Sequence, residues 1–277
     1  MTLGSSANGK YGITCYNKLN ILCREMNYTL SIEDLRPGCR GFLLGVRGIR
    51  IAGMQKLTLL DYPGRLACTV FTAGCNLRCP FCHNGPLLDG KTWDAEGEAR
   101  LLALLDRRKN VLEGVCVTGG EPLLQPDLPD LLREIRARGY LVKLDTNGMF
   151  PDRLAAVLAA GLADYVAMDL KNGPARWAET VGVPEADPAA ARASAALLMG
   201  GTVDYEFRTT VVRGLHDEAS LRAAGETIRG AKRWFLQRFV PPEAPLRAGL
   251  AAFSKEEMEH LAAAAAPFAG TVALRGI

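Results

Sequence analysis

The sequence predicts an α/β protein built on a parallel sheet, and three observations support this prediction. Short apolar runs, many of them β-branched, alternate along the chain with longer segments whose apolar residues recur at helical spacing. The helical segments have ten or more residues, enough to cross from one strand to a parallel neighbour. The chain of 277 residues is 48% hydrophobic and 23% charged, which is typical of a globular protein with a full core.

The predicted strands are continuous apolar runs, the pattern of strands that are buried on both faces. Six main strands are expected at residues 65–72, 114–118, 140–145, 164–170, 204–213 and 233–240. A last short strand is expected at residues 271–274. Six main strands are too few for a closed eight-stranded barrel, and the alternation alone does not show whether the sheet curls.

The predicted helices lie between these strands, at residues 94–108, 127–138, 151–160, 187–199, 217–229 and 254–265. Pro151 stands in a first turn, where a missing N–H costs little. Gly139 and Gly161 end two of the helices. Ser254 and Glu257 form the sequence signature of a capping box at the start of the last helix.

Residues 1–51 differ from the rest of the chain. They contain one alanine and four asparagines, and their apolar residues show no sustained period. We expect a poorly ordered N-terminal extension here and a core domain over residues 52–277. The alternative is a small extra domain or cluster site that uses Cys15, Cys23 and Cys39.

Charge and composition exclude several classes of partner. The net charge of +3 is too small to indicate a nucleic-acid-binding protein, which usually carries a clustered basic face. The sequence has no apolar run long enough to span a bilayer, so no membrane segment is expected. Eight cysteines without an obvious pairing pattern favour a reducing compartment, which indicates the cytoplasm.

The most informative stretch is a loop with three cysteines that follows the first predicted strand. Cys75, Cys79 and Cys82 are spaced C-x3-C-x2-C. Thiolates bind soft metal centres, and three ligands on a four-iron cluster leave one iron open for a group that is not protein. Two alternatives are a zinc site completed by His83 and a disulfide with one spare thiol.

Polar residues also gather where the other predicted strands end. Because buried parallel strands are otherwise apolar, charges at one end of successive strands indicate a site at the carboxyl edge of the sheet. Taken singly, Asp145 could cap a turn, Lys171 could be solvated and Arg208 could pair with a nearby acid. The set comprises Gly119, Gly120, Glu121, Pro122, Asp145, Thr146, Asn147, Gly148, Asp169, Lys171, Arg208, Gln237 and Arg238.

The cysteine loop resembles the signature of the radical S-adenosylmethionine (SAM) superfamily, C-x3-C-x-aromatic-C, with Phe81 as the aromatic residue. The stretch from Gly119 to Pro122 resembles the motif that binds the SAM amino group in this family. The resemblance implies a partial (β/α)6 TIM-like barrel. It also implies a [4Fe-4S] cluster on Cys75, Cys79 and Cys82, whose open iron is chelated by SAM.

The resemblance also implies roles for the residues at the strand ends. Gly119, Gly120 and Glu121 would bind the SAM ammonium, through close backbone approach and a carboxylate. Lys171 and Arg208 are the candidates for its carboxylate, and Asn147 is the candidate for the ribose. Phe81 would lie near the adenine, with plain packing of the loop as the alternative.

Four further stretches narrow the resemblance to the activating enzymes of glycyl radical enzymes: residues 61–64, 79–84, 145–148 and 168–171. In the pyruvate formate-lyase activating enzyme, the equivalents of Asp145, Thr146 and Asp169 hold a monovalent cation beside SAM. Over about residues 55–277, the chain resembles the long type of anaerobic ribonucleoside-triphosphate reductase activating protein. Two departures stand out. Phe239 and Val240 replace a histidine of the formate-lyase activase, and the cysteine-rich insert of multi-cluster activases is missing after Cys82.

The expected function is therefore radical SAM oxidoreductase chemistry on a partner protein. A reductant such as flavodoxin would supply an electron, SAM would be cleaved, and a hydrogen would be taken from a glycine of a glycyl radical enzyme. Anaerobic ribonucleoside-triphosphate reductase is the expected partner, and pyruvate formate-lyase is the alternative. Other readings are a radical SAM enzyme acting on a small molecule, such as a deazaguanine synthase, and a non-catalytic iron–sulfur or zinc protein.

Overall fold

The computed structural model describes residues 48–242 and 246–277. Its centre is one eight-stranded sheet in which the strands follow each other in chain order. The first strand is antiparallel to the second, and each later pair of neighbours is parallel. The strands are β1 (Ile51–Thr58), β2 (Ala67–Thr72), β3 (Gly114–Gly119), β4 (Leu141–Thr146), β5 (Tyr165–Asp169), β6 (Asp204–Val211), β7 (Ala231–Arg238) and β8 (Ala269–Arg275).

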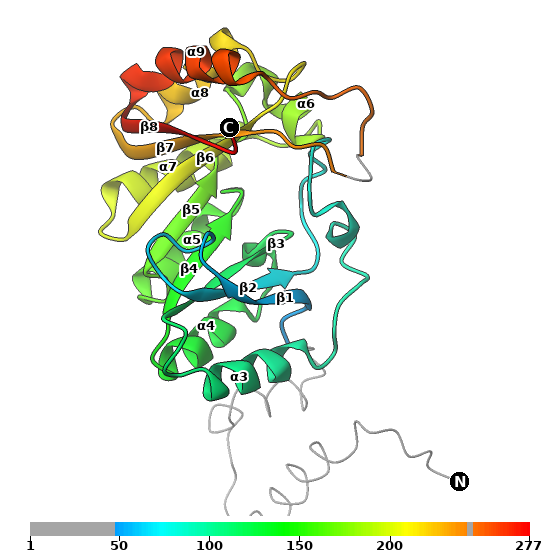
Figure 1. Ribbon diagram of the computed structural model, residues 1–277, viewed down its shortest axis with the longest axis vertical. Coiled ribbons are helices and arrows are strands. Elements are labelled where there is room, and N and C mark those ends of the chain that lie inside the picture. The colour runs from blue at the N-terminus through cyan, green and yellow to red at the C-terminus, as the bar shows by residue number, and fades with distance from the viewer. Residues whose placement is uncertain (1–47, 243–245) are drawn as a thin grey trace, which may run out of the picture. The chain divides into compact units, whose positions relative to one another are not determined.

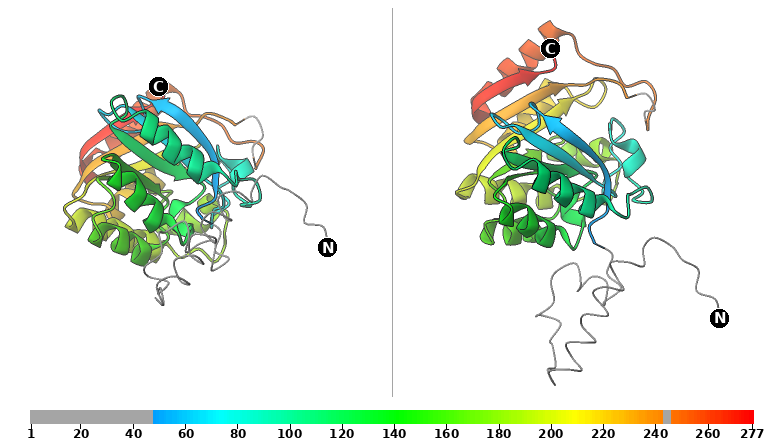
Figure 2. Two further views of the ribbon diagram at one scale, coloured as in Figure 1. Left: turned by 90° about the horizontal axis from the view of Figure 1, so that it is seen from below. Right: turned by 60° about the horizontal axis from the view of Figure 1, so that its bottom comes forward.

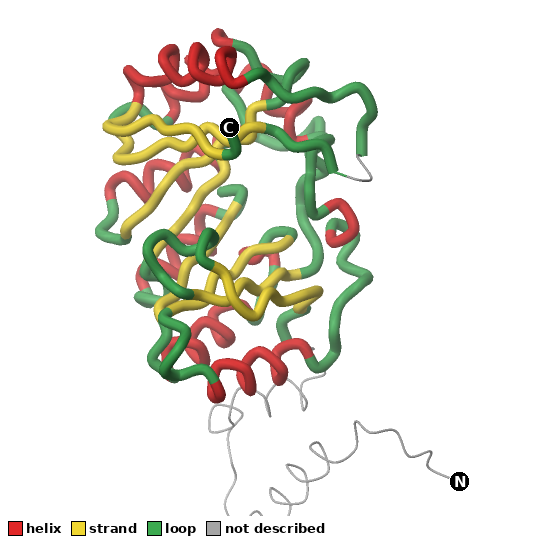
Figure 3. The backbone as a smooth tube through the Cα atoms, viewed as in Figure 1, coloured by secondary structure: helices red, strands yellow, loops and turns green. Residues whose placement is uncertain are grey.

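Helices connect the parallel strands and lie along the outer face of the curved sheet (Figures 1 and 2). The α-helices are α3 (Gly97–Arg107), α4 (Leu128–Ala137), α5 (Pro151–Ala159), α6 (Trp177–Val181), α7 (Pro188–Gly200), α8 (Glu218–Thr227) and α9 (Lys255–Ala265). The tube in Figure 3 shows a long connection between β2 and α3, which is loop apart from a short 3-10 helix at Gly85–Leu87.

Side chains of each strand alternate between the helix-covered outer face and the inner face of the sheet. In β4, Val142 and Leu144 are fully buried in the main hydrophobic core. Lys143 and Asp145, the residues that follow Val142 and Leu144, therefore point to the inner face. The sheet separates an apolar outer core from an inner face that carries charges.

These observations confirm the predicted fold class, a parallel α/β sheet of the partial TIM-like barrel type. The six main predicted strands are β2 to β7, and the capping box of Ser254 and Glu257 begins α9 as expected. Two elements were not predicted from the sequence: β1, which adds an antiparallel strand at one edge, and the short helix α6. Only four residues of β8 were expected, and the strand has seven. Among the described residues the sheet stays open, with β1 and β8 as its edges.

The packed unit begins at Ile49, slightly before the boundary expected at residue 52. Ile49 and Ile51 are buried, and the Ala73 N–H donates a 2.8 Å hydrogen bond to the carbonyl of Arg50. The rest of the predicted extension, residues 1–47, lies outside the described residues and stays a prediction. Within the described ranges, none of the helices has the length and apolar character needed to cross a bilayer.

Candidate active site

The cysteine loop leaves β2 at Ala73 and is fixed by backbone hydrogen bonds to two distant segments. The Gly74 N–H donates to the Leu87 carbonyl at 2.7 Å, and the Arg78 N–H donates to the Val181 carbonyl of α6 at 2.9 Å. Cys79 is buried, Cys75 and Cys82 are half-buried, and all three thiols are free. The fold therefore holds three cysteines in place on one side of a cavity.

This cavity, of about 250 Å³, lies at the carboxyl ends of the parallel strands. The residues to which the resemblance gave a cluster, SAM or cation role all line it: Cys75, Cys79, Phe81, Cys82, Gly119, Gly120, Glu121, Asp145, Thr146, Asn147, Asp169, Lys171 and Arg208. Pro122, Gly148 and Arg238, which belong to the wider set at the strand ends, do not line it. The remaining walls come from Leu77, His83, Asn84, Leu88, Thr118, Thr210 and Gln237. The residues with these expected roles are thus gathered in one place, and their individual ligand roles stay predictions.

Burial dominates the acidity of the three thiols. It raises the pKa of Cys75 to about 12 and that of Cys79 to about 11, and it raises the pKa of Cys82 as well. The ammonium of Lys171 acts in the opposite direction on all three. A bound metal deprotonates a coordinating thiol outright, so these groups become thiolates only when a metal centre is present.

The donor set fits a soft metal cluster better than a single ion. Three sulfur ligands are the kind that iron–sulfur clusters use. The Leu77 N–H lies 3.4 Å from the Cys75 sulfur and is placed to donate to a thiolate there. Within the described ranges, no three or more His, Cys, Asp or Glu side chains converge so as to hold one metal ion.

Gly119 and Gly120 let the end of β3 pass close to the cysteine loop. A Cβ on Gly120 would lie 2.1 Å from the Gly74 carbonyl oxygen, and one on Gly119 would lie 2.2 Å from the Thr72 nitrogen. Gly119 also has a φ of 118°, which L side chains rarely adopt. The glycines are required for this backbone packing, whatever they contribute to a ligand.

We expect Gly120→Ala to lower the free energy of unfolding by about 1–3 kcal/mol, because its Cβ must displace the backbone of the cysteine loop. Iron incorporation should fall with it, since Gly74 precedes Cys75. Gly200→Ala is the matched control, because a Cβ at the end of α7 meets nothing within 4 Å. Denaturant unfolding and iron analysis of both variants check the prediction, and equal stability of the two would contradict it.

Glu121 joins the loop after β3 to the loop after β4. Its fully buried carboxylate accepts hydrogen bonds from the Thr146 hydroxyl at 2.8 Å, the Asn147 N–H at 2.7 Å and the Leu123 N–H at 3.0 Å. Burial nevertheless raises the pKa of Glu121 to about 7. Glu121 thus positions the Thr146–Asn147 segment, in addition to any contact with the SAM ammonium.

The raised pKa of Glu121 predicts a pH-dependent stability in the absence of SAM. The folded-state pKa of about 7 exceeds the ordinary value of 4.5, so ionisation disfavours the folded state. Stability should fall by about 3 kcal/mol as pH rises through this interval. Glu121→Gln cannot ionise and should lose this dependence, whereas the exposed Glu259→Gln should keep it. Urea unfolding at pH 5 and pH 8 measures it, and equal slopes in both variants would disprove it.

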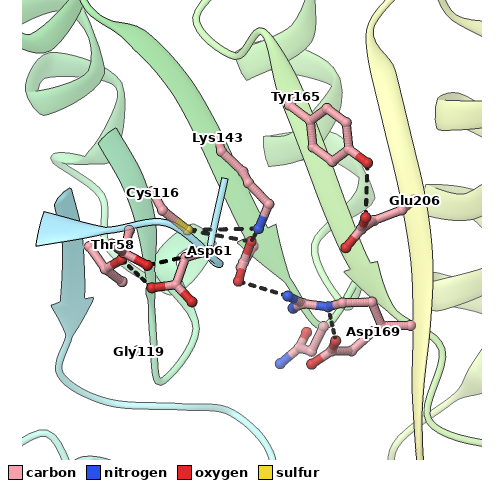
Figure 4. Close-up of polar contacts among 12 residues, drawn as sticks. Thr58, Asp61, Cys116, Gly119, Lys143, Tyr165, Asp169 and Glu206 are labelled. Atoms are coloured by element: carbon pink, nitrogen blue, oxygen red, sulfur yellow. Dashed lines mark hydrogen bonds and ion pairs between the residues drawn. The ribbon is translucent and has the colours of Figure 1, made fainter. Parts of the chain in front are cut away.

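Two carboxylates and three cations form an open series of ion pairs on β4, β5 and β6 and the residues that follow β5, here called the ion-pair chain. Arg208 donates from Nη1 to Asp145 at 3.0 Å and from Nε to Asp169 at 2.9 Å. The Lys171 ammonium donates to Asp169 at 2.8 Å, and the Lys143 ammonium donates to Asp145. Figure 4 shows Lys143 and Asp169 at neighbouring strands, with the ammonium of Lys143 pointing toward Cys116. Sequence analysis named every member except Lys143.

Attraction between the acidic and basic side chains sets the pKa values in this ion-pair chain. Burial alone would raise the pKa of each carboxyl, but Arg208 and the neighbouring lysines hold the pKa of Asp145 and of Asp169 below the ordinary value. Burial would likewise lower the pKa of Lys171, yet Asp169 and the nearby cysteines raise it. Asp145, Asp169 and Lys171 are therefore charged at neutral pH.

Phe81 is enclosed between Lys171 and a buried histidine. Its ring centre lies 6.0 Å from the Lys171 ammonium and 6.4 Å from the ring centre of His216. His216 accepts from the Val212 N–H at 3.1 Å and donates from Nε2 to the Lys171 carbonyl at 2.8 Å. Burial lowers the pKa of His216, so the ring is neutral. These contacts give Phe81 a packing role, and its contact with adenine stays a prediction.

Asn147 and Phe239 also have defined partners. The Asn147 amide donates to Asn76 at 2.8 Å and lies 3.8 Å from the Cys75 sulfur, so it ties the β4 loop to the cysteine loop. Phe239, in the place of the family's histidine, is buried, and its ring centre lies 6.3 Å from that of His83. At the end of β7, Gln237 lines the cavity and Phe239 does not.

Comparisons with known proteins agree on one superfamily. The family model of the radical SAM superfamily matches residues 69–219. The "Putative glycyl-radical enzyme activating enzyme MJ1227" of Methanocaldococcus jannaschii is 29% identical, over 70% of this chain and 81% of that protein. The pyruvate formate-lyase-activating enzyme of Clostridium pasteurianum is 35% identical over 44% of this chain and 52% of its own length. The 7-carboxy-7-deazaguanine synthase of Methanopyrus kandleri is 34% identical over 37% of this chain and 49% of its own length.

Solved structures support the fold. Streptococcus suis SuiB bound to the precursor peptide SuiA has a TM-score of 0.57 and 15% identity, over 98% of this chain and 62% of that one. TYW1 with a lysine-pyruvate adduct has a TM-score of 0.50 and 15% identity, over 72% of both chains. At this level of identity, the likeness concerns the fold alone.

Proposed function

Because the chain belongs to the radical SAM superfamily, whose cofactors are a [4Fe-4S] cluster and SAM, we propose that it activates a glycyl radical enzyme. The observation that carries the proposal is the length of the match to the glycyl-radical activating relative, which spans 81% of that protein. The match to the deazaguanine synthase of Methanopyrus kandleri spans 49% of that enzyme. The proposed reaction is removal of a hydrogen atom from a glycine Cα of a partner protein.

The cavity residues have complementary parts in this proposal. Cys75, Cys79 and Cys82 would hold the cluster, and Phe81 would pack beside the adenine. The bound cluster and SAM supply the reductive cleavage of SAM and the radical that takes the hydrogen. The protein binds, orients and excludes water, and none of its side chains needs to act as an acid or a base.

The charged and polar groups would bind the two ends of the amino acid part of SAM. Lys171 and Arg208 face the cavity and would pair with its carboxylate. The backbone at Gly119 and Gly120, with Glu121, would accept hydrogen bonds from its ammonium. Asn147 is the candidate for the ribose hydroxyls. These assignments agree with the placement of all six residues on the cavity wall.

Anaerobic ribonucleoside-triphosphate reductase is the proposed partner, and a flavodoxin-like protein is the proposed electron donor. The partner proposal follows the sequence resemblance over residues 55–277, and pyruvate formate-lyase is the second candidate. The test is anaerobic incubation of the reconstituted protein with SAM, dithionite and each candidate partner, followed by electron spin resonance. A glycine-centred radical on one partner is expected. SAM cleavage without a radical on either partner would refute the partner assignment.

The alternative is a radical SAM enzyme that acts on a small molecule, which the 34% identity to a deazaguanine synthase favours. It predicts that a small-molecule precursor is converted to 7-carboxy-7-deazaguanine, with consumption of SAM, in the absence of any partner protein. Chromatography of such an incubation distinguishes the two functions. Turnover of the small molecule would replace the activase proposal.

A further inference from the structure

Lys143 is a buried cation that the cofactor chemistry described above does not use. It is 2% exposed and lies on the inner face of β4, between Cys116 of β3 and Tyr165 of β5 in the strand register. Its ammonium contacts the Asp145 carboxylate and lies 3.7 Å from the Cys116 sulfur (Figure 4). A buried ammonium costs solvation free energy, so its position requires a compensating partner.

Both carboxylates of the ion-pair chain already have a protein cation on each oxygen. Asp145 accepts from Lys143 on one oxygen and from Arg208 on the other. Asp169 accepts from Arg208 on one oxygen and from Lys171 on the other. Each of the four carboxylate oxygens therefore has a cationic donor. The resemblance implied that Asp145, Thr146 and Asp169 hold a monovalent cation.

Thr146 is also engaged. Its hydroxyl donates to Glu121 at 2.8 Å and accepts from the Gly148 N–H at 3.1 Å. An alkali cation needs oxygen ligands whose lone pairs are free. In this chain, the three expected ligands are occupied by an ammonium, a guanidinium and neighbouring groups of the protein. The residues present do not fit the cation.

The charge balance of the ion-pair chain also indicates that an alkali cation does not fit here. The ion-pair chain contains three basic side chains, Lys143, Lys171 and Arg208, and two acidic ones, Asp145 and Asp169. One positive charge therefore has no counter-charge within it. The carboxylate of SAM supplies one negative charge and would balance it. An added alkali cation would restore the excess in a region where burial makes charge–charge repulsion strong.

We propose that Lys143 takes the place of the monovalent cation, so that SAM binding in this protein needs no alkali metal ion. Lys143 is a positioning residue: it pairs with one oxygen of Asp145, while Arg208 pairs with the other oxygen and lines the cavity in which the SAM carboxylate would lie. This proposal rests on SAM binding in the proposed function, but not on the identity of the partner protein.

The first test uses the unaltered, reconstituted protein. The SAM dissociation constant and the melting temperature are measured in potassium, sodium and tetramethylammonium chloride at equal ionic strength. We expect SAM affinity to agree within twofold and the melting temperature to stay constant across the three salts. A tenfold loss of affinity in tetramethylammonium alone, or a saturable rise in melting temperature with potassium or sodium, would overturn the proposal.

The second test is Lys143→Ala, with Lys56→Ala as the matched control because Lys56 is exposed on β1. We expect the Lys143 variant to bind SAM at least tenfold more weakly in tetramethylammonium chloride. Potassium, sodium or ethylammonium should restore most of this loss, whereas Lys56→Ala should match the parent protein in every salt. A folded Lys143→Ala protein that responds to none of these cations would refute the replacement.

The two tests separate this proposal from the function itself. Failure of the parent protein to bind SAM in any salt would reject the SAM site. Binding that depends on an alkali metal ion would reject only the role of Lys143. The melting temperature of the reconstituted parent protein in the three salts tests Lys143 without SAM, so the first test still decides if the alanine variant does not fold.

Discussion

Replacement of Cys79 by alanine is expected to abolish both the iron–sulfur absorbance and SAM cleavage. Cys79 is buried at the cavity wall, and among the described cysteines only Cys75 and Cys82 share that wall with it. Two remaining thiolates do not hold a four-iron cluster stably, and without the cluster no electron reaches SAM. Iron and sulfide analysis, the visible spectrum, and chromatography of 5′-deoxyadenosine and methionine after dithionite reduction measure the effect.

Cys68→Ala is the control for this prediction. Cys68 is as buried as Cys79 but lies on the outer face of β2, in the hydrophobic core and away from the cavity. Its replacement should cost about 1 kcal/mol of stability and leave the cluster and SAM cleavage intact. SAM cleavage that survives Cys79→Ala would show that another group binds the metal centre. Loss of cleavage in both variants would point to general destabilisation.

The fold was predictable wherever the sequence pattern has one structural meaning. Apolar runs of five to eight residues between amphipathic segments form β2 to β7. In a parallel sheet covered by helices, each strand must be apolar at least on the face that the helices cover. β1 was missed for a physical reason. It has register shifts at Gly53 and Thr58, and Gln55, Lys56 and Leu57 are exposed, so its apolar pattern is broken.

The location of the site was also predictable, because the carboxyl ends of parallel strands meet at one edge. What the sequence could not show is how the site residues contact each other. The sequence predicts that Glu121 contacts the SAM ammonium. Its hydrogen bonds to the Thr146–Asn147 segment could not be predicted, because they join two loops that lie far apart in the sequence. Lys143 was missed because it lies inside a strand. The spacing of two residues between Lys143 and Asp145 places both on the inner face and could have indicated it.

The period of two residues would have identified one more wall residue. Arg208 of β6 faces the cavity, and Thr210 lines it as well. A strand whose inward positions are polar and whose outward positions are apolar is therefore the sequence signal of a lined cavity in this fold. Residues at the strand ends form the rim of the site, whereas inward-facing positions within the strands, such as Lys143 and Thr210, are found only from the period of two residues.

Arg208→Met is expected to have the largest effect on stability, a loss of about 3–5 kcal/mol in the free energy of unfolding. Arg208 is the only described group that pairs with both Asp145 and Asp169, and its side chain is 15% exposed. Methionine has a similar length, so the variant removes the charge with little change in packing. Arg100→Met is the control, because the side chain of Arg100 is 63% exposed beside its two acidic partners, and such pairs contribute less than about 1 kcal/mol.

The pH dependence of that loss distinguishes a charge effect from a packing effect. In the parent protein, the pKa of Asp145 and of Asp169 is lowered, so their contribution to stability is complete above the ordinary pKa of 3.8 and is lost as pH falls below it. Without Arg208, burial raises both pKa values, and protonation relieves the penalty of two close carboxylates. The difference in stability between parent and variant should therefore be largest near pH 7 and shrink steadily toward pH 3. Urea unfolding of the metal-free proteins across this range measures it, and a difference that is independent of pH would mean that Arg208 acts by packing alone.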